Sequence, residues 1–128
     1  ACRRAGQIFV DNSSPAAVRQ TMADAHDRLQ GGLSLVVFPE GTRAHNGKIR
    51  NFKKGAYQLA VEFNLPVVPI TISGSYEIMP KGSKLTHWGH IMLTIHEPIH
   101  APEQGHDLAQ VMEQSREAIL SALPQRYK

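Results

Sequence analysis

The sequence predicts an α/β fold with a largely parallel or mixed sheet covered by helices. Short apolar runs bounded by Gly and Pro, typical of buried strands, alternate with longer segments in which apolar residues recur at helical spacing. The expected order is strand, helix, strand, helix, strand, strand, helix, and its short connections favour parallel neighbours. The chain has 128 residues, of which 41% are hydrophobic and 20% are charged, a composition that suits one small globular domain.

The first expected element is a short β-type run from Ile8 to Val10. A helix then begins at Ser14-Pro15, an N-cap followed by proline at the first helical position, and ends at Gly31-Gly32. The apolar residues of its inward face are Val18, Met22, Ala25 and Leu29. The run from Leu33 to Phe38 is continuous, apolar and too short for a helix, so we expect a strand buried on both faces.

The second half of the chain repeats this alternation. A helix is expected from Gly55 to Phe63, ending at Asn64-Leu65-Pro66, with one apolar face formed by Ala56, Leu59, Ala60 and Phe63. The segment from Val67 to Ile72 is expected to be the next buried strand, and the segment from Ile91 to Ile95 is expected to be another strand. A closing helix starts at Asp107, with Gln110 completing a capping box. Its inward residues are Leu108, Val111, Met112, Ile119 and Leu123.

Charge and cysteine usage narrow the class of protein. The single cysteine, Cys2, excludes an intrachain disulfide and favours a reducing compartment. The longest uncharged apolar-leaning run, residues 63–76, contains two prolines and is shorter than the roughly 20 residues of a membrane span. The net charge is +3, and residues 43–54 hold five Lys or Arg and no acidic residue. This basic segment should prefer an anionic partner.

Four residues with useful chemistry follow the expected strand Leu33 to Phe38, at the strand end where open α/β sheets bind ligands. Gly41 lets the backbone approach a ligand, Thr42 supplies a hydroxyl and Arg43 supplies the planar fork that suits a phosphate. The residues therefore indicate a phosphate site. The alternative is a turn in which Glu40 and Arg43 pair with each other or cap a helix.

The run Phe38-Pro39-Glu40-Gly41-Thr42-Arg43 resembles the signature of the glycerol-phosphate and lysophosphatidate acyltransferases. Three further segments resemble motifs of that family in the same order, namely Gly6 to Asp11, Phe52 to Ala56 and Val68 to Ile70. A final strand ending in Glu97-Pro98-Ile99 also resembles the strand that closes this family's pattern. Asn12 departs from the pattern because family members often have arginine there.

The resemblance implies a role for each matching residue. Arg43 should hold the acceptor phosphate, Glu40 and Thr42 should shape the acceptor pocket, and Gly41 should permit a close turn. Lys53 and Lys54 should add charge near the phosphate or face anionic lipid head groups, the alternative being a solvated basic loop. Gly6 and Asp11 of the second motif are also expected to contribute to substrate binding, whereas Pro69 should be structural.

The implied activity is transfer of a fatty acyl group from a thioester to the free hydroxyl of a lysophosphatidate-like acceptor. The family's general base is a His-x-x-x-x-Asp motif, and none of the seven histidines here has aspartate five positions later. We therefore expect residues 1–128 to be the C-terminal part of one acyltransferase domain, truncated at the N-terminus and inactive alone.

No catalytic residue is assigned within this chain, and the expected partners follow from the resemblance. They are an acyl-coenzyme A or acyl-carrier-protein donor, a lysophosphatidate-type acceptor and the cytoplasmic face of a membrane. No cofactor, metal or nucleic acid is expected, because the histidines lack a recognised zinc spacing and the positive charge is local. The alternative is a non-catalytic module that binds anionic lipids or a membrane surface.

Overall fold

The computed structural model describes residues 15–42, 44, 46–100 and 108–128. The chain forms two compact units, Ala1–Val37 and Phe38–Lys128. The predicted strand Ile8 to Val10 and Asp107 of the predicted capping box lie outside the described residues, so both stay predictions.

The first unit contains helix α1 (Pro15–Gln30), as the sequence predicts. The helix ends in a Schellman motif: Gly32, at φ +78°, donates its N–H to the Leu29 carbonyl, and the Leu33 N–H reaches the Arg28 carbonyl at 3.1 Å. Ala25 is buried, on the face that the sequence predicts to point inward. The double glycine therefore ends the helix by supplying a left-handed residue.

The predicted strand from Leu33 to Phe38 is wrong in both pairing and burial. Within the described residues the segment joins no strand, and Val36 and Phe38 are 83% and 71% exposed. A strand buried on both faces needs a hydrogen-bonded neighbour on each side and a helical layer on each face. The composition of this run suits such a setting, but within the described residues it forms no strand.

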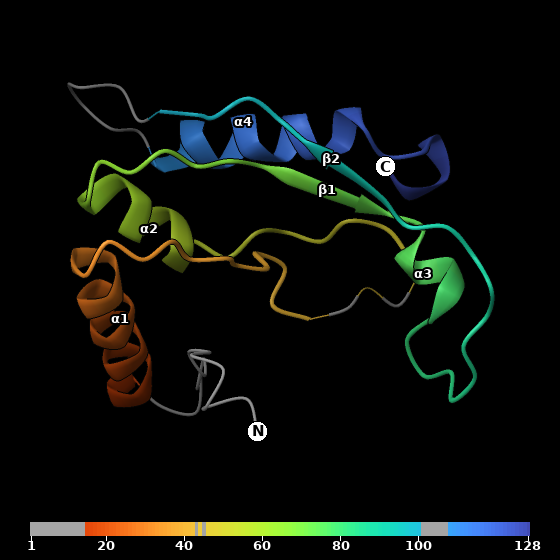
Figure 1. The fold of residues 1–128 in the computed structure, drawn as a ribbon, viewed down its shortest axis with the longest axis horizontal. Coiled ribbons are helices and arrows are strands. Elements are labelled where there is room, and N and C mark those ends of the chain that lie inside the picture. The colour runs from red at the N-terminus through yellow and green to blue at the C-terminus, as the bar shows by residue number, and fades with distance from the viewer. Residues whose placement is uncertain (1–14, 43, 45, 101–107) are drawn as a thin grey trace. The chain divides into compact units, whose positions relative to one another are not determined.

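The second unit is built around helix α2 (Gly55–Glu62), helix α4 (Leu108–Ser121) and an antiparallel pair of strands, β1 (Ile70–Ser73) and β2 (Met92–Ile95) (Figure 1). Both helices and the second strand confirm the sequence prediction. The first strand begins three residues later than predicted, but an antiparallel bridge between Val67 and Ile99 extends the pairing toward Val67. The pairing between these strands is therefore antiparallel, within the expected α/β class.

The core of this unit lies where α2 meets α4. Tyr57 and Val111 are its buried centre, and the partly buried residues packed against them are Phe52, Val61, Val67, Ile99, Leu108 and Met112. Helix α2 ends at Glu62, and Asn64, two residues further on, has a φ of +50° and supplies the left-handed residue that glycine supplies after α1. Tyr57 was missing from the predicted apolar face, yet its ring is more deeply buried than most of that face.

A buried hydroxyl joins the strand pair to α4. Thr71 is 1% exposed, and its Oγ1 donates to the Ile119 carbonyl at 3.0 Å. The same oxygen lies 2.8 Å from Nε2 of His96. Because a hydroxyl has a single proton, His96 must donate its Nε2–H to Thr71. The three groups therefore fix the tautomer of His96 as well as the strand-to-helix contact.

The C-terminus is held against a short helix that the sequence did not predict, α3 (Ser75–Ile78). The closing 3₁₀ turn, η2 (Gln125–Tyr127), directs the Tyr127 hydroxyl to Oε1 of Glu77 at 2.7 Å, and Arg126 pairs with the same carboxylate. This hydrogen bond, aided by Arg126, holds the pKa of Glu77 below its usual value despite some desolvation.

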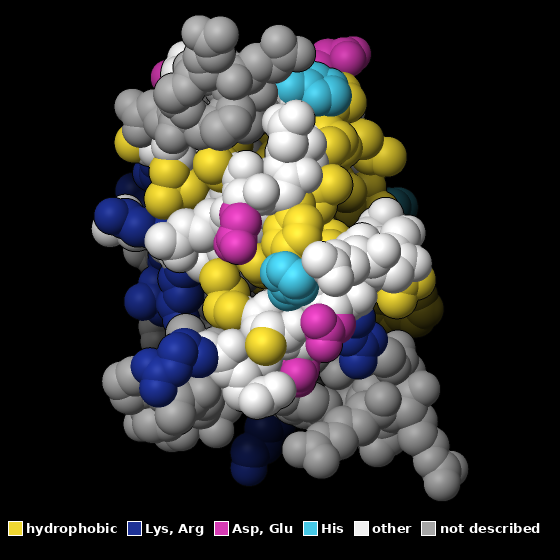
Figure 2. Space-filling model, turned by 90° about the vertical axis from the view of Figure 1, so that its left-hand side faces the viewer, with side chains coloured by type: hydrophobic (Ala, Val, Ile, Leu, Met, Phe, Trp, Pro, Cys, Tyr) yellow, Lys and Arg dark blue, Asp and Glu magenta, His cyan; other side chains and the backbone are white. Residues whose placement is uncertain are grey.

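The sheet face that carries Ile70 and Ile72 is open, so the prediction that Val67 to Ile72 forms a buried strand is wrong for this face of β1. Their cross-strand partners Ile95 and Leu93 are also exposed. Thr71, on the opposite face, packs on α4, so α4 covers one side of the pair. Figure 2 shows hydrophobic side chains at the surface in one view of the molecule. Among the described helices, none has the length and hydropathy needed to cross a bilayer.

Candidate functional site

The residues 38–41 form a tight turn at the start of the second unit. The Gly41 N–H donates to the Phe38 carbonyl at 3.0 Å, and Gly41 has a φ of +69°. Glycine adopts this left-handed conformation without steric cost, which explains its presence in the turn. Thr42 follows with an exposed side chain.

Lys53 lies directly over this turn. Its backbone N–H donates to the Pro39 carbonyl at 2.9 Å. A Cβ added at Gly41 would lie 2.8 Å from both Cε and Nζ of Lys53, closer than a carbon side chain tolerates. The lysine ammonium therefore occupies space that is free because residue 41 is glycine. Two motifs that are separated by a polar loop in the sequence thus meet in the structure.

Glu40 fixes the other side of the turn. Its carboxylate accepts the backbone N–H of Arg50 at 2.8 Å through Oε2, and the side chain is half-buried. This bond ties the turn to the segment that leads from residue 50 to Lys53. Glu40 thus has the supporting contact expected of a turn residue, and its carboxylate is directed to a backbone amide.

The first turn of α2 adds positive potential beside Lys53. Lys54 occupies the N-cap position without a side-chain hydrogen bond to the helix, and the first turn has no acidic residue. The N-terminus of a helix carries a partial positive charge and unpaired N–H groups. Two exposed lysines at this end are therefore unfavourable alone and favourable when an anion is bound.

Aromatic side chains and Arg116 pack around residues 50–52. Phe52 stacks on Tyr57 with ring centroids 6.3 Å apart, and the Arg116 guanidinium lies 5.9 Å above the Phe52 ring. Arg116 also donates to the Arg50 carbonyl at 3.4 Å. Burial raises the pKa of Tyr57, opposed in part by the nearby Ser115 hydroxyl, so the phenol stays neutral. Sequence reasoning missed Arg116, because its contacts with the segment span more than sixty positions.

An open cleft of about 240 Å³ lies between residues 51–52 and α4. Its lining residues are Asn51, Phe52, Met112, Glu113 and Arg116, none of which belongs to the predicted acceptor site. Within the described part of the chain, no three side chains of the types that ligate metals come together.

The structure therefore brings together Glu40, Gly41 and Lys53, three of the predicted site residues, and places Thr42 and Lys54 beside them in the chain. The remaining predicted residues, Gly6, Asp11 and Arg43, lie outside the described residues. Their roles stay predictions.

The turn and the basic segment fall within a match to a known family. Residues 1–73 match the family described as Acyltransferase, and the chain belongs to this family.

The relatives place the chain more narrowly. It is 45% identical over 96 residues to the chloroplastic 1-acyl-sn-glycerol-3-phosphate acyltransferase LPAT1 of Arabidopsis thaliana, covering 74% of this chain and 27% of the relative. It is 35% identical over 106 residues to 1-acyl-sn-glycerol-3-phosphate acyltransferase alpha of Homo sapiens, covering 82% and 37%. These names confirm the predicted resemblance to the lysophosphatidate acyltransferases.

A solved structure supports the fold. The crystal structure of the 1-acyl-sn-glycerophosphate (LPA) acyltransferase PlsC from Thermotoga maritima superposes with a TM-score of 0.79 at 32% identity, covering 96% of this chain and 51% of that one. The α/β fold class predicted from the sequence is confirmed. The chain spans between 27% and 37% of the lengths of the Arabidopsis and human relatives.

Proposed function

We propose that the intact protein transfers a fatty acyl group from a thioester to the free hydroxyl of 1-acylglycerol-3-phosphate in phospholipid biosynthesis, and that this chain binds the acceptor phosphate. The observation that carries the proposal is the contact between Lys53 and the turn at Gly41. This contact brings two family motifs together at the Lys53 ammonium group. Relatives that bear the activity in their names support the reaction class.

Phosphate binding follows from the charges around the turn. Lys53 and Lys54 offer two ammonium groups, and the N-terminus of α2 adds its partial charge. Arg43, two residues beyond Gly41, is proposed to grip the phosphate through two parallel N–H donors. The Glu40 carboxylate would repel a phosphate if it turned inward, and its bond to the Arg50 amide holds it in place. Thr42 is proposed to donate its hydroxyl to the same ligand. Gly6 and Asp11 are proposed to complete the acceptor site.

The chemical step requires a general base, and no His-x-x-x-x-Asp motif occurs among these 128 residues. The acceptor oxygen attacks the thioester carbonyl, a C–O bond forms and the C–S bond breaks. The hydroxyl proton passes to a histidine and then to the departing thiolate. We propose that a His-x-x-x-x-Asp pair from outside these 128 residues supplies the base, because none of the histidines here has the required aspartate. The 128-residue chain alone should therefore be inactive.

The remaining partners are proposed on the same basis. The acyl donor is an acyl-coenzyme A or an acyl-carrier-protein thioester, and no further cofactor takes part. The protein works at the cytoplasmic face of a membrane, where its lipid acceptor resides.

Kinetics on the intact protein test the phosphate site. We expect Arg43→Ala to lower kcat/KM for 1-acylglycerol-3-phosphate by roughly tenfold to a hundredfold, since hydrogen bonds to charged groups are worth about 1.5–3 kcal/mol. Arg43→Lys should fall between the parent and Arg43→Ala, because lysine keeps the charge and loses the fork. Lys53→Ala should also lower kcat/KM, whereas Lys48→Ala, a change in the same basic segment, should not.

Substrate pairs give the result that would refute the proposal. An acceptor without the phosphate should react poorly with the parent enzyme and lose little further activity in Arg43→Ala. Equal losses for phosphorylated and unphosphorylated acceptors would show that Arg43 does not bind the phosphate. An intact protein that binds lysophosphatidate vesicles but shows no acyl transfer would instead support the non-catalytic lipid-binding module.

A further inference from the structure

A loop of residues 79–91 connects α3 to β2, and its base is closed by backbone contacts. The His87 N–H donates to the Ile78 carbonyl at 2.8 Å. Gly74, at φ +89°, lies so close to the His90 carbonyl that any side chain would collide with it. Both ends of the loop are therefore fixed to each other, as in a compact Ω-type loop.

The tip of the loop is also hydrogen-bonded. The Ser83 N–H donates to the Pro80 carbonyl at 3.1 Å, and the Ser83 hydroxyl donates to the Leu85 carbonyl at 2.8 Å. The Leu85 N–H returns a bond to the same hydroxyl at 3.1 Å. These bonds turn the chain at the tip.

Large apolar side chains project from this ordered loop into solvent. Trp88 is fully exposed at 104%, and Leu85 is 73% exposed. Met79 and Ile91, at the two ends of the loop, are about half exposed. An exposed tryptophan leaves a large apolar area in contact with water. Clusters of exposed apolar side chains mark interaction surfaces.

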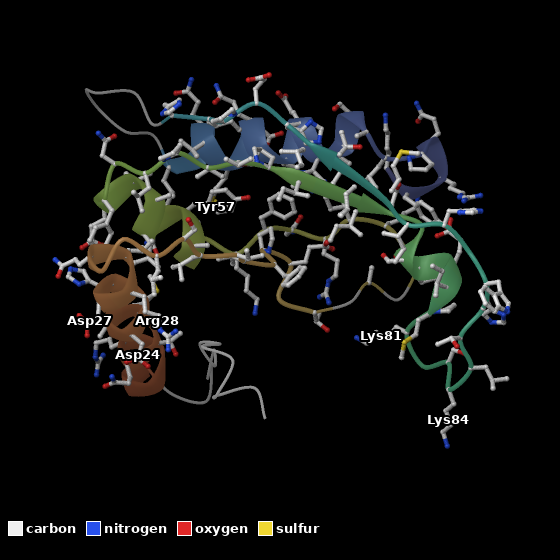
Figure 3. All side chains as sticks on the ribbon, in the orientation of Figure 1. Asp24, Asp27, Arg28, Tyr57, Lys81 and Lys84 are labelled. Atoms are coloured by element: carbon white, nitrogen blue, oxygen red, sulfur yellow. The ribbon has the colours of Figure 1, made fainter. Side chains whose placement is uncertain are left out.

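The charges in the loop have one sign. Residues 78–96 contain no aspartate or glutamate, and Lys81 and Lys84 flank the tip. Figure 3 shows Lys84 extending outward from the end of the loop, below the β1–β2 pair. The loop also begins at α3, where Tyr76 lies beside Gly47 of the basic segment. The basic segment therefore contacts the helix from which the loop begins.

We propose that residues 79–91 dock on an anionic lipid bilayer, with Trp88 and Leu85 entering the interface and Lys81 and Lys84 meeting lipid head groups. Tryptophan favours the boundary between acyl chains and head groups, and each lysine near an anionic surface adds attraction. A protein partner would need a groove for the tryptophan and acidic residues for the lysines. A bilayer with anionic lipids offers an apolar interior for the tryptophan and negative charge for the lysines over its whole surface.

The proposal deepens the proposed function, because a lipid acceptor is reached from the membrane. It names the part of the chain that meets the membrane, whereas acyl transfer depends on the turn at Gly41. The two are measured separately: vesicles of phosphatidylcholine and phosphatidylglycerol without lysophosphatidate report docking alone.

Trp88 is the sole tryptophan of the 128-residue chain, so its fluorescence reports its own environment. Adding vesicles that contain phosphatidylglycerol should shift the emission of the chain to shorter wavelength. Lipids brominated near the head of the acyl chain should quench it. Pure phosphatidylcholine vesicles should give a much smaller shift.

Vesicle co-sedimentation of variants tests whether the loop residues bind the vesicles that change the Trp88 fluorescence. Trp88→Ala should weaken partitioning about tenfold, the effect of withdrawing roughly 60 Å² of apolar surface at about 25 cal/mol per Å². Replacing Lys81 and Lys84 with Gln should weaken it by about fivefold per lysine, and added salt should remove this difference. Matched controls elsewhere, Ile95→Ala for an exposed apolar residue and Lys128→Gln for an exposed lysine, should bind like the parent.

Three outcomes would overturn the proposal. One is vesicle binding with unchanged Trp88 emission, which would assign docking to another surface. A second is equal binding to neutral and anionic vesicles. The third is a blue-shifted emission without lipid, together with a dimer in sedimentation, which would show that a second copy covers the loop. A positive vesicle result combined with unchanged kinetics of the Arg43 variants would retain the docking loop and remove the acceptor site.

Discussion

Gly41→Ala tests whether the turn at Gly41 exists to hold Lys53. An alanine in this left-handed conformation costs about 1 kcal/mol in stability. In addition, its Cβ would lie 2.8 Å from Cε and Nζ of Lys53, so the lysine must swing away from the turn. The flexible side chain can move at little cost in stability, and the main effect should therefore fall on the ligand that Lys53 contacts.

The magnitude follows from the proposed phosphate contact. Loss of one charged hydrogen bond, worth about 1.5–3 kcal/mol, should reduce kcat/KM for 1-acylglycerol-3-phosphate in the intact protein by roughly tenfold to a hundredfold. Gly32→Ala is the matched control, because Gly32 has a similar φ of +78° and no atom within 4 Å of an added Cβ. Both variants should lose similar thermal stability, but Gly41→Ala alone should lose activity.

Melting curves and steady-state kinetics on the two variants decide the matter. If Gly41→Ala retained the parent kcat/KM while melting like Gly32→Ala, Lys53 would have no part in acceptor binding. If activity fell equally for acceptors with and without phosphate, the turn would matter for folding of the site and not for its charge.

Two further predictions concern stability. Thr71→Val should lower the free energy of unfolding by about 1–2 kcal/mol, because it removes the hydroxyl shared by the Ile119 carbonyl and His96, as chemical denaturation would measure. The Tyr127 hydroxyl is the main cause of the lowered pKa of Glu77, so the ionised carboxylate should stabilise the fold. This contribution should be complete above the ordinary carboxyl pKa of about 4.3, and it should be lost as the pH falls through the lower pKa of the folded state. The difference in melting temperature between the parent and Glu77→Gln should therefore shrink on acidification.

Controls for these variants come from neighbouring positions. Thr94→Val, directly across the sheet from Thr71, should cost less, and an equal loss would show that the buried hydroxyl is not the important group. Glu97→Gln, on an exposed carboxylate, should leave the acid profile of the parent unchanged. A difference between the parent and Glu77→Gln that stayed constant from neutral to acidic pH would contradict the assigned role of the carboxylate.

The sequence predicted the helices well because their limits are local. Gly32 and Asn64 both adopt left-handed conformations just past a helix, and both were recognisable as stops from residue type alone. The burial of strands was not predictable in the same way. Leu33 to Phe38 and Ile70 to Ile72 have the composition of buried strands, yet their burial depends on neighbours that a short run cannot specify. The short helix α3 was missed because four residues carry no periodicity.

The candidate site shows the same division. Glu40, Gly41 and Lys53 were predicted through motif resemblance, and the structure adds that the two motifs are in contact. The backbone partner of Glu40 was not predictable, because an amide ten positions away has no sequence signature. Arg116 was missed for a similar reason, since its contacts with residues 50 and 52 depend on how α4 packs.

The basic segment is positioned by polar bonds more than by its own burial. Lys53 is bonded to Pro39, the Arg50 amide to Glu40, and the Arg50 carbonyl to Arg116. Each of these bonds is formed at the surface, where a typical net contribution is about 1 kcal/mol or less. Breaking one should therefore leave the fold intact while releasing the cations from the turn. Catalytic defects without unfolding are the expected signature of substitutions in this segment.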